Sequence, residues 1–199
     1  MRVIGWVLIM LILSSSSTLA IAPITGEIIK DAQIYGKTQS RSALADFLLP
    51  WTAYEENASK LDQTTERAYL YTPYLLIATD AREKSLNKQS VQITDSERIL
   101  TDYAGTLSFS VTLFSATPFF AKNAIAVLQQ DHKVITAYQA TIPPEAEKTT
   151  WNPNPPFFTT QCYFYFLEKD IIPNKALVLS IVTSNKQEHR FYFDISRIK

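Results

Sequence analysis

Apolar and polar side chains alternate along much of the second half of the chain. Between residues 107 and 113, leucine, phenylalanine and valine fill the odd positions, and serine or threonine fills the even ones. Phe191, Phe193 and Ile195 repeat this pattern near the C-terminus. A period of two is typical of a β-strand with one buried face. The pattern therefore predicts strands over residues 107–113 and 189–195.

Four further segments of this half have the composition of strands. Residues 123–128 and 134–141 flank a short polar stretch and predict a hairpin. Residues 160–167 are rich in aromatic side chains, and residues 176–183 are apolar on both faces, which favours a central place in a sheet. Strands at this spacing predict an antiparallel sandwich or a strongly curled sheet.

The first half of the chain carries helix signals instead. Thr25 is a capping residue before the first predicted helix, and Gly36 is expected to end it. The longest apolar segment contains Pro73, which we expect to kink the helix because proline lacks a backbone donor and clashes with the preceding turn. The predicted helices are 26–35, 42–49 (before Pro50), 61–84 and about 94–104 (before Gly105).

These patterns predict an α+β fold. A helical N-terminal part, residues 24–104, is expected to pack on an antiparallel, β-sandwich-like C-terminal part, residues 105–199. A length of about 180 residues suits one domain, so we expect residues 21–199 to fold as a unit.

The N-terminus has the pattern of a secretory signal peptide. Arg2 precedes an apolar run over residues 3–13, and small residues around Ala20 offer a cleavage site. The run is much shorter than the ~20 residues of a membrane-spanning helix. We therefore expect residues 1–20 to be removed and the protein to be periplasmic or extracellular, with no transmembrane span after cleavage. The alternative is an uncleaved N-terminal anchor.

Charge and glycine content argue against several classes of partner. The chain has 19 basic and 19 acidic residues, so loss of Arg2 with the signal segment leaves an excess of one negative charge. This balance gives no electrostatic basis for binding nucleic acid. The four glycines are isolated, so they form no phosphate-binding loop, and no cofactor is expected.

Residues suited to catalysis or to metal binding are few. Cys162 is the only cysteine, which excludes an intramolecular disulfide, and one cysteine with two distant histidines does not make a usual zinc site. His132 and His189 are the only histidines, so a nucleophile–histidine–acid set has to use one of them. No catalytic residue is assigned and no metal is expected. We interpret the protein as non-catalytic, with an unrecognised hydrolase as an alternative.

One predicted site lies within the expected long helix. At 100° per residue, two arginines and two tyrosines fall along one line of an otherwise apolar helix. Guanidiniums in such a place require an anion, which is supplied either by nearby protein carboxylates or by a ligand. The second alternative predicts a small acidic ligand between helices and sheet. The residues are Arg67, Tyr71, Tyr74 and Arg82.

A second predicted site is the proline-rich connection over residues 142–158. Large aromatic side chains in a stiff loop can anchor a partner at little entropic cost. Its aromatic residues are Trp151, Phe157 and Phe158. The leading interpretation is therefore an exported protein that binds another protein or a component of the cell envelope. The alternative is the binder of an acidic ligand described above.

Overall fold

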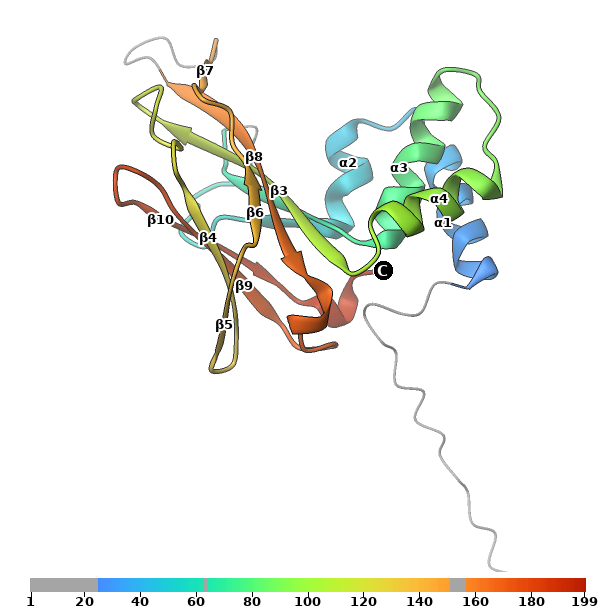
Figure 1. Cartoon of the computed structure of the whole chain (residues 1–199). Coiled ribbons are helices and arrows are strands. Elements are labelled where there is room, and N and C mark those ends of the chain that lie inside the picture. Colours follow the sequence, from blue (N-terminus) through green and yellow to red (C-terminus); the bar gives the residue numbers. More distant parts are fainter. Residues whose placement is uncertain (1–24, 63, 151–156) are drawn as a thin grey trace, which may run out of the picture.

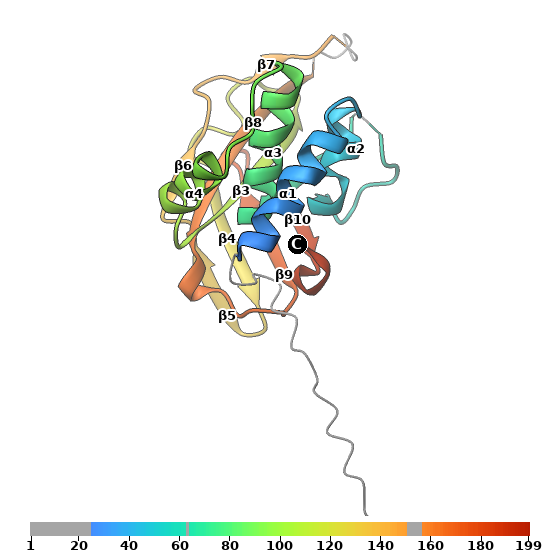
Figure 2. The same ribbon diagram turned by 90° about the vertical axis from the view of Figure 1, so that its right-hand side faces the viewer.

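The computed structural model describes residues 25–62, 64–150 and 157–199. It has the expected α+β fold, arranged in three layers: a four-stranded sheet, a six-stranded sheet and a group of helices (Figure 1). The helices lie on the far side of the six-stranded sheet, as the view from that side shows (Figure 2). They are α1 (Gly26–Thr38), α2 (Leu44–Leu48), α3 (Pro73–Leu86) and α4 (Ile93–Asp102).

The six-stranded sheet is antiparallel and has the order β1-β2-β3-β8-β6, with β7 also paired to β8. Its longest pairing joins β3 to β8 from Thr106 opposite Leu167 to Ser115 opposite Phe158. The alternating segment at 107–113 therefore forms a strand, as predicted. The strands are β1 (Thr52–Tyr54), β2 (Arg67–Tyr71), β3 (Thr106–Ser115), β6 (Gln139–Thr141), β7 (Glu147–Lys148) and β8 (Phe158–Leu167).

The four-stranded sheet is also antiparallel and has the order β10-β9-β4-β5. The central position predicted for the segment 176–183 is confirmed, since β9 lies between β10 and β4. The predicted hairpin is present, with Asp131 in the left-handed conformation at its turn (φ 50°). The strands are β4 (Ile125–Gln130), β5 (Lys133–Thr136), β9 (Leu177–Val182) and β10 (Glu188–Phe193).

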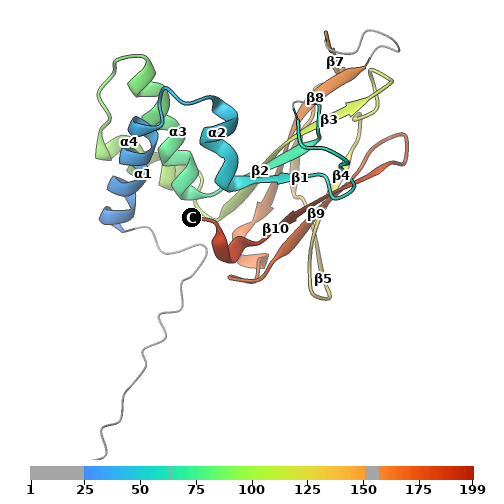
Figure 3. The same ribbon diagram turned by 180° about the vertical axis from the view of Figure 1, so that it is seen from behind.

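The two sheets face each other across the main hydrophobic core. Phe193 of β10 is 2% exposed and meets Phe109 of β3 edge to face, with ring centroids 5.3 Å apart. The sheets also join along one side, where Glu55, just after β1, forms an isolated bridge with Phe191 of β10 (Figure 3). The expected sandwich-like arrangement is therefore the one observed.

The prediction of a long kinked helix over 61–84 is wrong. Residues Arg67–Tyr71 form β2 inside the sheet, and α3 begins at Pro73. The Thr72 hydroxyl caps this helix by accepting a hydrogen bond from the Leu75 backbone N–H at 3.2 Å. Proline is favoured at the first helical position, where its missing N–H costs nothing. Residues 24–104 thus contribute two strands, β1 and β2, as well as helices.

Other boundaries also differ from the prediction, and the strand predicted over 189–195 ends at Phe193. The predicted strand over 134–141 divides into β5 and β6, which belong to different sheets. The first helix is capped by Thr25 as expected but continues through Gly36 to Thr38. A Cβ atom at Gly36 would lie 2.1 Å from the Ala78 carbonyl oxygen. The glycine is therefore needed for the close approach of α1 and α3, and it does not end the helix.

A second hydrophobic core lies between the helices and β2. It joins aromatic and aliphatic side chains of α1, α2 and α3 to Tyr69 and Tyr71 on the outer face of the six-stranded sheet. None of the helices in the described residues is both long and apolar enough to cross a membrane. The predicted signal segment lies outside the described residues.

Candidate functional site

The four residues of the predicted acidic-ligand site do not lie on one helix. Arg67 and Tyr71 belong to β2, whereas Tyr74 and Arg82 belong to α3. The helical line on which this site was predicted therefore does not exist. The physical reason is the start of α3 at Pro73, which divides the apolar segment into a strand and a helix.

Each of these side chains has its own surroundings. The Arg67 guanidinium donates to the Tyr69 hydroxyl at 2.8 Å and to the Thr65 carbonyl oxygen at 3.1 Å. Arg82 donates to the Ser42 carbonyl oxygen at 2.9 Å, and its guanidinium lies 5.2 Å from the centre of the Phe47 ring. The two arginines are thus held by oxygens and an aromatic face in separate places.

The two tyrosines are part of the second hydrophobic core. The Tyr74 hydroxyl donates to Asp31 at 2.9 Å, and burial together with this bond raises the pKa of Tyr74. Burial also raises the pKa of Tyr71 to about 12, and the nearby Tyr163, Tyr69 and Glu83 add to the effect. Both phenols are therefore held neutral, which suits packing between helices and sheet.

Only part of the predicted aromatic anchor lies within the described residues. Trp151 lies outside the described residues. Phe157 and Phe158 are half-buried, and Phe158 is the first residue of β8 and packs against the main core. Phe158 therefore contributes to packing within this chain.

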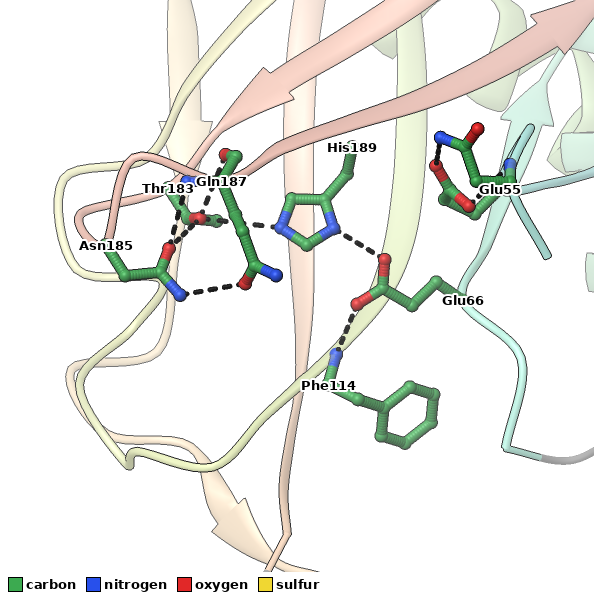
Figure 4. A network of polar contacts seen from close by, with 8 residues as sticks. Glu55, Glu66, Phe114, Thr183, Asn185, Gln187 and His189 are labelled. Carbon is green, nitrogen blue, oxygen red and sulfur yellow. Dashed lines mark hydrogen bonds and ion pairs between the residues drawn. The ribbon is translucent and has the colours of Figure 1, made fainter.

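A polar network between the two sheets was missed by the sequence analysis (Figure 4). Glu66, directly before β2, places one carboxylate oxygen 2.6 Å from Nδ1 of His189 on β10. Its other oxygen accepts from the Phe114 backbone N–H at 2.9 Å. The side chains of His189 and Glu66 are only 7% and 15% exposed. Because these residues are 123 positions apart, no local sequence signal points to the pair.

The order carboxylate, imidazole, hydroxyl in this network resembles that of a hydrolase, but the hydroxyl is directed elsewhere. Thr183 Oγ1 lies 3.4 Å from His189 Nε2, and closer to the Asn185 side-chain oxygen (2.6 Å) and the Gln187 carbonyl oxygen (3.2 Å). A hydroxyl has a single proton to donate, and here two acceptors that are not bases compete for it. The network therefore joins strands and does not activate a nucleophile.

The outer face of the four-stranded sheet is unusually apolar. Side chains on this face come from all four strands, so that Ile125 lies beside Val182, and Val178 lies beside Tyr192. Ile125, Val134 and Tyr192 are more than half exposed (60%, 62% and 54%). We call this surface the apolar sheet face. It consists of Ile125, Val127, Val134, Val178, Val182 and Tyr192.

Two charged residues of β10, Arg190 and Glu188, share this face and pair with each other at its edge. Arg190 of β10 lies 2.9 Å from a Glu56 carboxylate oxygen and 3.6 Å from one of Glu188. The apolar sheet face therefore presents aliphatic and aromatic surface with little net charge. It lies on the side of the sandwich away from the helices (Figure 1).

Three chains of known structure resemble part of this protein. No family model and no curated protein sequence matches the chain. The archaellum periplasmic stator protein FlaG from Sulfolobus acidocaldarius is 11% identical over 45% of this chain and 87% of its own, with a TM-score of 0.32. The archaellum periplasmic stator protein complex of FlaF and FlaG from the same organism is 13% identical over 46% of this chain and 79% of its own, with a TM-score of 0.32. Similarity at this level supports no conclusion about function.

Proposed function

We propose that this protein is an exported, non-catalytic module that binds another protein through the apolar sheet face. The observation that supports the proposal is the exposure of Ile125 beside Val182, together with that of Val134 and Tyr192 elsewhere on the same face of the sheet. The outward side of a two-layer sandwich normally carries polar side chains. A contiguous exposed apolar surface rimmed by polar residues is typical of a protein interaction site.

The energetics agree with this assignment. The outward β-branched residues of β4 and β9 are not needed to fill the core, because the inward residues of these strands already form it. Burying apolar surface contributes about 25 cal/mol per Å². A partner that covers these side chains therefore gains affinity without the cost of burying an unpaired charge, since Arg190 keeps its own carboxylates.

A photo-reactive amino acid placed on the surface tests this function. We expect one discrete protein adduct in the native host when the residue replaces Ile125 or Val182. Ile34 on α1 is a matched control, because it is also apolar and 61% exposed but lies on the helical side. Val182→Lys, in a chain that carries the reactive residue at Ile125, should abolish the adduct while the circular dichroism spectrum stays unchanged. Equal labelling at Ile34, or no labelling at the sheet positions, contradicts the proposal.

Export is a separate part of the proposal. The support for it is the signal-peptide pattern of residues 1–20. Intact-mass measurement of protein from the native host should show the loss of about twenty N-terminal residues. A full-length chain recovered from the cytoplasm contradicts export.

A further inference from the structure

Helices α1 and α3 end at the same place on the surface. They run side by side in the same direction, because Asp31 bonds Tyr74 near their beginnings and Gly36 packs against Ala78 and Ala81 further along. The close approach at Gly36 brings the last turn of each helix, and the loop after it, next to the other. A hollow of about 430 Å³ lies between these two ends.

The polar side chains that line this hollow are cationic or hydroxyl-bearing. Lys37, Arg41 and Lys88 are exposed at its rim, while Ser40 and Ser85 are half-buried. No acidic residue lines it. The full lining is Lys37, Thr38, Ser40, Arg41, Ser85, Leu86 and Lys88. The site therefore offers charge of one sign together with hydroxyl donors.

The three cations have no carboxylate partner within the described residues. Ion pairs elsewhere in this part of the chain show the contrast: Lys84, one turn before the hollow, is held by Asp80 at 2.8 Å and Asp95 at 2.7 Å. Lys37, Arg41 and Lys88 form no such pair in the described structure. Their positive charge is therefore available to a bound anion.

Helix dipoles account for only part of this charge. The C-terminal end of a helix carries about −0.5 of an elementary charge, so two helix ends offset about one of the three cations. The last carbonyls are also satisfied by the backbone, since the Gln39 N–H bonds to Tyr35 and the Asn87 N–H bonds to Glu83. About two positive charges remain, which matches a phosphate-type dianion.

The backbone at Lys88 places its side chain at the rim of the hollow. Its φ of 55° lies in the left-handed region, which is common for the residue that follows the end of a helix. This conformation closes α3, since the Gln89 N–H bonds to the Lys84 carbonyl oxygen at 2.8 Å.

We infer that the hollow between the ends of α1 and α3 binds a phosphate-type anion. Arg41 supplies a planar fork that matches two phosphate oxygens, Lys37 and Lys88 supply point charges, and Ser40 and Ser85 supply hydroxyl donors. The anion is either a free phosphate, which can carry two charges, or the singly charged phosphodiester headgroup of an anionic lipid, since both present non-bridging phosphate oxygens. This site is separate from the apolar sheet face and stands independently of it.

Calorimetric titration with inorganic phosphate tests whether the site binds free phosphate. Chloride keeps the ionic strength constant during the titration. We expect binding that weakens at least about tenfold in the double variant Lys37→Gln/Arg41→Gln, because charge-assisted bonds are lost. Lys88→Asn is a second variant that removes the charge and retains a residue suited to the left-handed backbone. Lys30→Gln, at the other end of α1, is the matched control and should bind like the wild type.

Vesicle sedimentation distinguishes the two sources of phosphate. Vesicles of phosphatidylglycerol and phosphatidylcholine in a one-to-three ratio are compared with vesicles of phosphatidylcholine alone. If the protein binds anionic vesicles but not inorganic phosphate, and Lys88→Asn abolishes the vesicle binding, the site is assigned to a lipid headgroup. Binding to neither probe, or equal losses in Lys30→Gln and Lys88→Asn, overturns the inference.

Discussion

The Glu66 carboxylate lies 2.6 Å from Nδ1 of His189 and joins the six-stranded sheet to the four-stranded sheet. With Glu66 ionised, the contact places a proton on Nδ1, because a carboxylate can only accept. The same carboxylate also accepts from the Phe114 backbone N–H. One side chain therefore satisfies two donors from different strands, close to the bridge between Glu55 and Phe191.

Removal of this carboxylate should destabilise the protein. Glu66→Ala leaves the His189 ring nitrogen and the Phe114 N–H without their partner, and we expect a loss of about 2–3 kcal/mol in the free energy of unfolding by urea. Glu145→Ala, an exposed carboxylate, should change stability by less than about 0.5 kcal/mol. A double-mutant cycle with His189→Ala should give a coupling of at least about 1 kcal/mol. Additivity of the two changes contradicts the pairing.

Two glycines of α1 should respond to alanine in opposite directions. A Cβ atom at Gly36 would lie 2.1 Å from the Ala78 carbonyl oxygen, a backbone atom that cannot move aside cheaply. Gly36→Ala should therefore cost about 1–3 kcal/mol or more through overpacking. Gly26, at the start of the same helix, has no atom within 4 Å of the added Cβ. Gly26→Ala should stabilise by about 0.4–1 kcal/mol. Thermal unfolding of both variants is the measurement, and equal effects contradict this packing.

The strands and the fold class could be predicted because their signals are local. The alternation at 107–113 and the apolar character of 176–183 specify strands with no knowledge of their neighbours. The prediction of one helix over 61–84 failed for a related reason. Its nearly unbroken apolar run is compatible with a buried strand or a buried helix, and a proline can either kink a helix or begin one. The pair Thr72 and Pro73 was in fact a complete helix start, with a cap followed by proline at the first position.

The sites could not be predicted in the same way, because they depend on contacts between distant segments. Glu66 contacts His189, and Lys88 and Lys37 come to line the same hollow, only after the sheets and helices have assembled. The apolar sheet face was also hidden in the sequence. A segment with apolar residues on both sides predicts burial on both sides. In β9 one side is buried in the core, and Val182 on the other side is 44% exposed.

Neighbouring residues of β10 test which side of the strand faces the core. Phe193 is 2% exposed, so Phe193→Ala should cost about 3–5 kcal/mol. Tyr192, the adjacent residue, is 54% exposed on the apolar sheet face. Tyr192→Ala should cost less than about 1 kcal/mol in the isolated protein. Urea unfolding measures both, and a similar cost for the two variants would place the strand in the opposite orientation.

The stability of the protein should fall at alkaline pH because of Tyr71. Burial between α3 and the six-stranded sheet raises the pKa of this phenol to about 12, with smaller contributions from Tyr163, Tyr69 and Glu83. A raised pKa in the folded state means that folding favours the neutral form. Its contribution to stability is therefore complete below pH 10, the value for an unfolded tyrosine, and is lost as the pH rises from 10 to 12. Since part of the ring is exposed, we expect the free energy of unfolding to fall by about 1 kcal/mol between pH 8 and pH 11.

The variant Tyr71→Phe is the control, because it has no proton to lose at this position. Compared with its own stability at pH 8, its urea midpoint should decline less by pH 11 than that of the wild type. Parallel declines in the two proteins would show that the Tyr71 phenol titrates alike in the folded and unfolded states, which would contradict its burial beneath α3.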